Sequence, residues 1–439
     1  MTRGSSADPR LPARSARTRT RTLALLVLGY TGFYLCRSNF AVSMPAILDE
    51  LAKSGVDPRS ARLALGWITT LGTLAYALGK LPGGGLADFL GGRRVYLAGM
   101  GGAVVFTVVF ALGGSIPVFT LAWMGNRAMQ AVGWPGIVKL VSRWFPASSY
   151  GTAMGVVSLS FLWGDSAVRY GIGLLFKAGF DWRGVYFLAA GTLAALWVLS
   201  FFTLRESPGE VGEAEPAANP TNVFGEAGSD PTPPGLGALL GPLFRSPVFW
   251  VVCGLSFGLT LLRETFNTWT ALYFVEAVGM AKDRAAGMSG LFQLAGGFSV
   301  LLAGYLGDRM RRGGRAAIIG GGLALTGLAL LGLAKVDPRG SEFAPVALVA
   351  ATGFLLIGPY SYLAGAISLD LGGKRGGATT CGIVDFVGYL GGAFAGRAMA
   401  GISADRGWPA AFVLLAGVAW ASALGACALM AVQAERSRG

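Results

Sequence analysis

Long apolar runs recur along the chain, separated by short segments that hold most of the charged residues. A helix needs about 20 apolar residues to cross roughly 30 Å of hydrocarbon. Hydrocarbon offers no partner to backbone groups, so spanning runs of this length must be helical. The pattern predicts twelve membrane-spanning helices, at residues 22–48, 61–88, 95–114, 115–140, 149–178, 183–204, 247–278, 283–308, 314–334, 343–370, 375–402 and 408–432. We therefore expect an all-α integral membrane protein.

One segment without apolar periodicity divides these runs into two groups of six. Residues 206–246 are rich in Pro, Gly, Ala and Glu, which is typical of a flexible linker. The predicted organisation is a basic tail at 1–21, an N-terminal six-helix half at 22–205, a cytoplasmic linker at 206–246, a C-terminal six-helix half at 247–433 and a tail at 434–439.

A short motif repeats at matching places in the two halves. Residues 84–88 read GGLAD and residues 304–308 read GYLGD, and arginines follow both. Chance explains one copy in a Gly-rich chain, but two copies at the same helix count favour duplication of a six-helix unit. We expect a structural loop whose carboxylate caps a helix end and binds nearby arginines in one conformation. Its expected members are Asp88, Arg93, Arg94, Asp308 and Arg312. Such a duplication resembles the major facilitator fold, whose substrate site lies between pseudo-symmetric halves.

Charge and composition narrow the class further. Charged residues make up 13% of the chain and hydrophobic residues 53%, and the formal net charge is +13. In a soluble protein that charge would suggest a nucleic-acid partner. Here the basic residues gather in every second loop, on one side of the membrane, as membrane insertion alone would produce. This pattern predicts an inner (cytoplasmic) membrane location, both termini in the cytoplasm, contact with the lipid bilayer and no nucleic-acid partner. An Arg-rich transit peptide at the N-terminus is the alternative to a basic tail.

The chain offers few residues for redox or metal chemistry. Its 4 cysteines lie in apolar segments without paired spacing, and it has no histidine. The placement of the cysteines indicates neither a disulfide framework nor a zinc site. The absence of histidine excludes imidazole as a proton relay or a metal ligand. We expect no metal and no cofactor.

Charged residues inside the predicted spans each need a partner or a purpose, because a charge at the bilayer centre costs about 2.5–3.5 kcal/mol on insertion scales. Arg37 lies midway along the first span and Arg263 midway along the seventh. Duplication relates these two spans, so the two guanidinium groups should face each other across the central axis. Their forked donors suit a doubly charged oxyanion, and phosphate fits best.

Neighbouring polar residues support a water-filled path beside Arg37. Tyr34 and Tyr30 lie one and two turns before it on the same helix face, and Tyr76 and Lys80 share a face of the second span. Individually, such tyrosines are as often structural contacts between helices as they are ligands for a substrate.

The remaining intramembrane charges allow ion pairs or a coupling role. Asp165 and Arg169 are one turn apart, which predicts an internal ion pair. Glu264 points about 100° around its helix from Arg263, which leaves it able to pair with another span or to serve in coupling. Asp385 has the same option or serves as a proton site. Five mid-span bases (Arg37, Lys80, Arg127, Arg169, Arg263) face three acids (Asp165, Glu264, Asp385), which leaves two positive charges for an anionic cargo.

Motifs over nearly the whole chain resemble one family. The first span holds Gly29-Tyr30, Tyr34, Arg37, Asn39-Phe40 and Met44-Pro45, and the second holds Tyr76 and Lys80. The fourth holds Asn126, Gln130, Gly133-Trp134-Pro135, Lys139 and Trp144-Phe145, and the seventh Leu261-Leu262-Arg263 and Trp269. Later spans hold Gly358-Pro359, Lys374-Arg375-Gly376 and Gly388-Tyr389-Leu390-Gly391-Gly392. Together these motifs resemble the organophosphate:phosphate antiporters.

The resemblance implies a carrier rather than an enzyme, in which two arginines bind the phosphoryl group and lysine and tyrosines line the cavity. The implied substrate-binding residues are Arg37, Arg263, Lys80, Tyr30, Tyr34, Tyr76 and Tyr389, and the predicted site also includes Phe161, Asn267 and Gln293. Phe161 stands where glycerol-phosphate carriers have histidine, and Gln293 where an acidic residue is expected. These departures concern the organic part of the substrate and leave the phosphate part intact.

These observations predict a monomeric secondary transporter that exchanges a small organophosphate (sugar phosphate, glycerol phosphate or phosphoglycerate) for inorganic phosphate. Two alternatives remain at this point. One is a proton-coupled symporter of another organic anion that uses Asp165, Glu264 or Asp385 as the titrating group. The other is a non-transporting sugar-phosphate sensor, which the family also contains.

Overall fold

The computed structural model describes residues 10–435 except 218, 220, 221 and 311–313, and these residues form helices and connecting segments without a strand. The N-terminal half contains α1 (Arg10–Lys53), α2 (Pro58–Leu90), α3 (Gly92–Leu112), α4 (Ile116–Ala131), α5 (Gly133–Trp144), α6 (Tyr150–Lys177) and α7 (Trp182–Thr203). The C-terminal half contains α9 (Pro247–Tyr273), α10 (Lys282–Ser289), α11 (Leu291–Arg309), α12 (Gly314–Lys335), α13 (Phe343–Tyr362) and α14 (Ser368–Glu435). The short α8 (Leu236–Arg245) lies between them. The prediction of an all-α fold is confirmed.

Helices and predicted spans coincide, with local breaks. The fourth span comprises α4 and α5, which meet at Val132, and π-helical turns follow α9 and α13 at Phe274–Val278 and Leu363–Ile367. Within α14, Gly373 (φ 56°) and Gly407 (φ 78°) adopt left-handed backbone conformations. A residue with a Cβ is strained there, so glycine permits the two sharp turns that divide this long segment.

Hydropathy alone marks seven segments of the described chain as long and apolar enough to cross a membrane. In the N-terminal half these are α3 and α7, whereas the cavity-lining helices α1, α2, α4 and α6 carry polar and charged side chains. Cavity-facing residues therefore lower the mean hydropathy of the inner helices. The count of twelve spans stays a prediction from the full sequence pattern.

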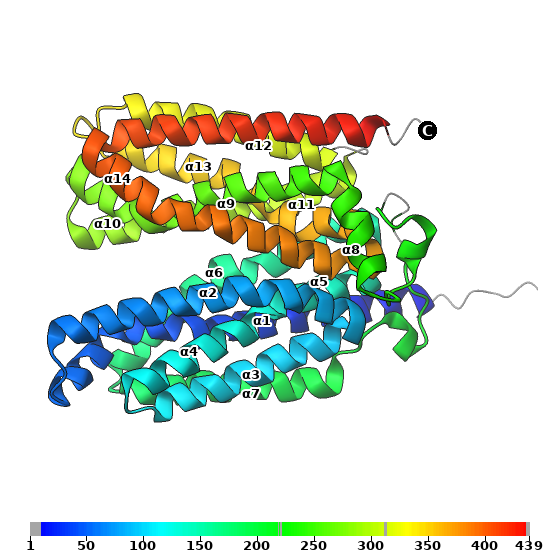
Figure 1. The fold of residues 1–439 in the computed structure, drawn as a ribbon, viewed down its shortest axis with the longest axis horizontal. Coiled ribbons are helices and arrows are strands. Elements are labelled where there is room, and N and C mark those ends of the chain that lie inside the picture. Colours follow the sequence, from blue (N-terminus) through cyan, green and yellow to red (C-terminus); the bar gives the residue numbers. More distant parts are fainter. Residues whose placement is uncertain (1–9, 218, 220–221, 311–313, 436–439) are drawn as a thin grey trace, which may run out of the picture.

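The two halves form separate bundles that meet along paired helices, α2 with α14 and α6 with α11 (Figure 1). The contact is close at glycines: a Cβ on Gly84 would lie 2.5 Å from the carbonyl oxygen of Ala378, and one on Gly304 would lie 2.6 Å from that of Gly151. Both glycines belong to the repeated motif. At these two positions the motif lets backbones of opposite halves approach.

The segment between the halves packs against both of them, in contrast to the predicted flexible linker. Glu215 forms an ion pair with Arg143 of α5 and, at 3.0 Å, with Lys374 of α14. Burial raises the pKa of Glu215, but hydrogen bonds from these two bases outweigh it and hold the pKa below its ordinary value. This packing leaves no periodic signal in the sequence, because single polar contacts carry it.

Further linker contacts fall on the first turns of α14. The backbone of Val223 donates to Leu371, and Asp230 lies 3.0 Å from Arg375. The start of α1 and the end of α14 lie on this same side of the molecule (Figure 1). Residues 10–21, predicted as a tail, are helical and continue α1, while residues 1–9 and 436–439 lie outside the described chain.

Candidate functional site

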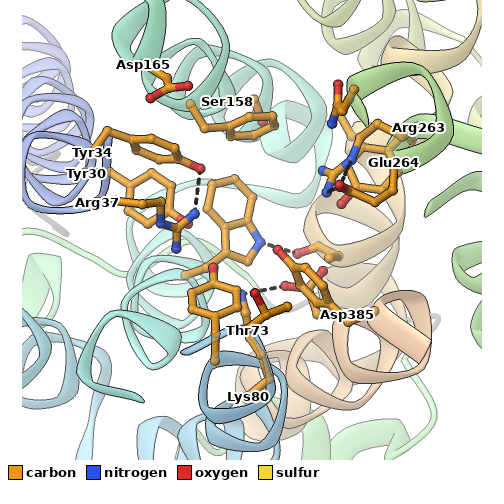
Figure 2. A pocket seen from close by; sticks show the side chains of 18 of the residues that line it. Tyr30, Tyr34, Arg37, Thr73, Lys80, Ser158, Asp165, Arg263, Glu264 and Asp385 are labelled. Atoms are coloured by element: carbon orange, nitrogen blue, oxygen red, sulfur yellow. Dashed lines mark hydrogen bonds and ion pairs between the residues drawn. The ribbon is translucent and has the colours of Figure 1, made fainter. Parts of the chain in front are cut away.

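A cavity of 350 Å³ lies between the two halves and draws its walls from both (Figure 2). This volume falls in the usual range for small-molecule sites, about 300–1,000 Å³. Every residue of the predicted substrate site lines it: Tyr30, Tyr34, Arg37, Tyr76, Lys80, Phe161, Arg263, Asn267, Gln293 and Tyr389. Asp165, Arg169, Glu264 and Asp385 line it as well. The structure thus brings together residues that are up to 359 positions apart, from Tyr30 to Tyr389.

On the N-terminal wall, Arg37 is held by neutral groups. Its Nε donates to the amide oxygen of Gln130 at 3.0 Å, and one terminal nitrogen donates to the Tyr34 hydroxyl at 3.1 Å. Gln130 in turn donates to Asn126 at 2.7 Å, which fixes the orientation of the amide. The guanidinium carbon also lies 4.5 Å from the Tyr76 ring centroid. Arg37 is therefore positioned without a carboxylate among the described residues.

A second arginine of this wall was not part of the predicted site. The guanidinium carbon of Arg127 on α4 lies 4.3 Å from the Tyr76 ring centroid. One of its terminal nitrogens is buried and has no hydrogen-bond partner within the described chain. The sequence signal was the charge count, which included Arg127 but could not show which bases are paired.

On the C-terminal wall, the equivalent arginine has an acidic partner. Arg263 binds Glu264 beside it, with 3.0 Å between Nε and a carboxylate oxygen, and it stacks on Tyr360 at 4.3 Å (Figure 2). The divergence of adjacent residues around a helix left Glu264 free to pair with another span. The structure pairs it with Arg263, since both side chains are long enough to curl toward the same cavity.

Lys80 and Asp385 connect the halves across the cavity floor. Their nitrogen and oxygen atoms are 2.7 Å apart, and Lys80 is almost fully buried. Nearby, the rings of Tyr76 and Tyr389 meet edge to face with centroids 5.4 Å apart. Of the two options that the sequence left for Asp385, the structure shows pairing with another span, and the partner is a residue predicted to bind substrate.

The remaining predicted residues form further contacts in the lining of the cavity. Arg169 donates to Asp165 at 2.9 Å, which confirms their predicted ion pair, and Ser38 donates to the same carboxylate. Gln293 donates to Asn267, and the ring of Phe161 packs edge to face on Trp134 with centroids 5.9 Å apart. Phe161 thus presents an apolar surface to the cavity.

The charges of the cavity follow from these pairs. Asp385 neutralises Lys80, Asp165 neutralises Arg169 and Glu264 neutralises Arg263. Arg37 and Arg127 are the two lining cations left without an acidic partner in the part of the chain that the structure describes. The surplus predicted from the sequence therefore lies on one wall, in the N-terminal half.

The repeated motif holds the halves together on the linker side, with partners that differ from the expected arginines. Asp88 binds Lys139 at 2.9 Å and accepts from the backbone of Thr379 in the other half at 2.8 Å. Asp308 binds Arg315 at 2.7 Å and accepts from the backbone of Gly151 at 2.8 Å. Each carboxylate thus accepts a backbone hydrogen bond from the opposite half, and that of Asp308 falls on the first turn of α6, where an acidic cap is favourable.

The motif arginines have other positions. Arg93 donates through Nε to the carbonyl of Leu204 at 2.7 Å, beyond the end of α7, and Arg94 is exposed. Arg312 lies outside the described residues. Lys139 and Arg315 take the roles expected of the arginines; they stand outside the motif, on α5 and α12, and no local spacing rule identifies them.

Comparison with known proteins places the fold and its relatives. A crystal structure of a variant of the E. coli fucose:proton symporter FucP superposes with a TM-score of 0.73 at 16% identity, covering 94% of this chain and 99% of that chain. The chain is 27% identical to a probable hexose phosphate transport protein of Chlamydia muridarum, over 97% of this chain and 92% of the relative. It is 25% identical to the membrane sensor protein UhpC of Salmonella typhimurium, over 97% and 94% respectively. Residues 26–396 match the model of the Major Facilitator Superfamily, and the chain belongs to that family.

Proposed function

We propose that this chain is a secondary transporter that exchanges a small organophosphate for inorganic phosphate by alternating access. The observation that carries the proposal is the cavity between the halves, in which Arg37 and Arg127 have no acidic partner within the described residues. Two forked cations attract a doubly charged oxyanion and bind it through charge-assisted hydrogen bonds. The named function of the Chlamydia relative, hexose phosphate transport, agrees with this chemistry.

The same charges account for obligatory exchange. Closing an empty cavity would bury two unneutralised guanidinium groups, and isolated charges are costly to remove from water. A bound phosphate dianion neutralises them and permits closure, so the protein crosses between conformations mainly when loaded. Repulsion between Arg37 and Arg263 adds little, because Glu264 offsets the charge of Arg263. No proton transfer and no catalytic step is needed in this scheme.

The orientation and assembly follow the sequence pattern. We place the protein in the inner (cytoplasmic) membrane as a monomer, with the linker and both termini on the cytoplasmic side. The linker-side contacts of Asp88, Asp308 and Glu215 then close the cytoplasmic end of the cavity. In that orientation, the described conformation is the one that faces outward.

Transport of labelled phosphate tests the proposal. Proteoliposomes loaded with phosphate are expected to take up external labelled phosphate, and liposomes loaded only with chloride are not. Arg37→Lys keeps the charge but loses the fork and is expected to abolish uptake. The matched control is Arg284→Lys, an exposed arginine paired with Glu342 on the surface. If uptake needs a proton gradient but no internal phosphate, the protein is a proton symporter and the proposal of exchange is wrong.

The similarity to the sensor UhpC supports a second candidate, a receptor that binds organophosphate without transporting it. Both candidates share the binding cavity and differ in turnover. Saturable phosphate binding by purified protein together with no exchange in proteoliposomes would favour the sensor.

A further inference from the structure

Arg127, which is not among the residues that carry the family resemblance, lines the cavity beside Arg37. Arg127 lies on α4, and its guanidinium carbon is 4.3 Å from the ring centroid of Tyr76. Arg37 approaches the same ring at 4.5 Å. The two guanidinium carbons therefore lie at most about 9 Å apart, and both side chains line the same cavity, where two forks suit one phosphoryl group.

Burial makes Arg127 more than a structural neighbour. One terminal nitrogen of Arg127 is shielded from solvent without a hydrogen-bond partner in the described chain. A buried donor without a partner destabilises the protein, and does so more strongly when it is charged. Other cations of the cavity avoid that cost through carboxylates, as Lys80 does with Asp385. Arg127 itself lines the cavity and has no carboxylate partner in the described chain, so its charge is available to an anionic ligand there.

We infer that Arg127 and Arg37 together bind the phosphoryl group, and that the cavity selects dianionic phosphomonoesters whose organic part is uncharged. This inference rests on the proposed function and deepens it. It moves the centre of phosphate binding from a pair across the two halves to a pair within the N-terminal half.

Charge balance carries the selectivity. A phosphomonoester dianion neutralises Arg37 and Arg127, and the remaining cations already have carboxylate partners. A third negative charge, such as the carboxylate of a phosphoglycerate, would find no free cation among the described lining residues and would lie near Glu264 or Asp385. Neutral polar groups on the opposite wall, including Asn267, Gln293 and Ser361, suit hydroxyl groups instead. The favoured organic part is therefore a polyol.

Calorimetric titration of the purified full-length protein tests the inference. The probes are inorganic phosphate, glycerol 3-phosphate and 3-phosphoglycerate at pH 7.5. Wild-type protein is expected to bind the first two and to bind 3-phosphoglycerate at least about tenfold more weakly. Arg127→Gln should weaken phosphate binding about 10- to 100-fold, since it removes hydrogen bonds to a charged group. Arg127→Lys should retain part of the affinity, and Arg284→Gln should leave it unchanged.

Thermal unfolding without ligand gives a second, independent readout. Arg127→Gln removes a half-buried charge, one nitrogen of which is shielded without a partner, and is expected to raise the melting temperature, which also shows that the variant folds. Phosphate binding by Arg127→Gln at the wild-type affinity would overturn the inference. Tight binding of 3-phosphoglycerate that only Arg127→Gln removes would assign Arg127 to a second acidic group and also overturn it. Absence of phosphate binding by wild-type protein would instead refute the proposed function.

Discussion

Arg37 and Arg263 occupy corresponding places in the two halves, yet their surroundings differ. Arg37 is held by the amide of Gln130 and the hydroxyl of Tyr34, and it keeps its full charge for a ligand. Arg263 is bound by Glu264, and its charge is offset. Duplication determines where the two guanidinium groups lie along their helices. Single neighbouring residues then decide which of them presents net charge, so pseudo-symmetry of the fold does not imply symmetry of the site.

Removing the bridge between the walls should have the largest energetic effect. Lys80→Ala leaves Asp385 buried without a partner, and breaking a buried ion pair in this way costs about 3–5 kcal/mol. Thermal unfolding of purified protein measures the loss. Lys80→Met combined with Asp385→Leu removes both charges and should recover most of the stability. Equal destabilisation by the single and the double variant would show that the ion pair itself is not what matters.

Giving the N-terminal wall an acid should make it resemble the C-terminal wall. Gln130→Glu places a carboxylate beside Arg37, and competition from this internal partner is expected to weaken phosphate binding at least about tenfold. Titration calorimetry checks this result. Gln130→Met, which removes the hydrogen bond without adding charge, is the matched control and should lose less. Unchanged affinity in Gln130→Glu would contradict the importance of a free Arg37.

The reverse change should strengthen binding. Glu264→Gln frees the charge of Arg263 and is expected to raise phosphate affinity by a few fold, up to about tenfold. Glu342→Gln on the surface of the same half is the control, because it makes the same chemical change outside the cavity. A fall in affinity would mean that Glu264 positions Arg263 for the ligand rather than competing with it.

The smallest effect is expected at the linker. Glu215→Gln should lower the free energy of unfolding by about 1 kcal/mol, because Glu215 and Arg143 are partly exposed and the amide oxygen of Gln can still accept a hydrogen bond from the buried Lys374. The pKa of Glu215 is lowered in the folded protein, so the contribution is complete above the ordinary carboxyl pKa of about 4.3 and is lost as pH falls through the lowered value. The difference between the wild-type and variant melting temperatures should be constant from pH 8 to pH 5 and should vanish in stronger acid. Glu226→Gln, the same change at an exposed residue of the linker, is the control and should leave the melting temperature unchanged.

The fold was largely predictable because the bilayer imposes a simple rule on helix length. Long runs of apolar residues located the helices. The cost of burying charge in the bilayer identified Arg37, Lys80 and Arg263 from the sequence alone. The cavity gathers every predicted lining residue.

Pairing was less predictable, since it depends on tertiary geometry. Helix angles alone separate Glu264 from Arg263, but their flexible side chains meet. Lys139 and Arg315 displace the expected arginines as partners of Asp88 and Asp308 because of where neighbouring helices pack. Linker contacts such as that of Glu215 arise from isolated polar residues and leave no periodic trace in the sequence.

The most direct test compares the two equivalent arginines under one condition. Phosphate is titrated into purified wild-type, Arg37→Gln and Arg263→Gln proteins, with folding verified by thermal unfolding. We predict that Arg37→Gln loses at least about tenfold more affinity than Arg263→Gln, because Arg37 presents an unneutralised charge and Arg263 does not. Equal losses, or a larger loss in Arg263→Gln, would contradict this prediction.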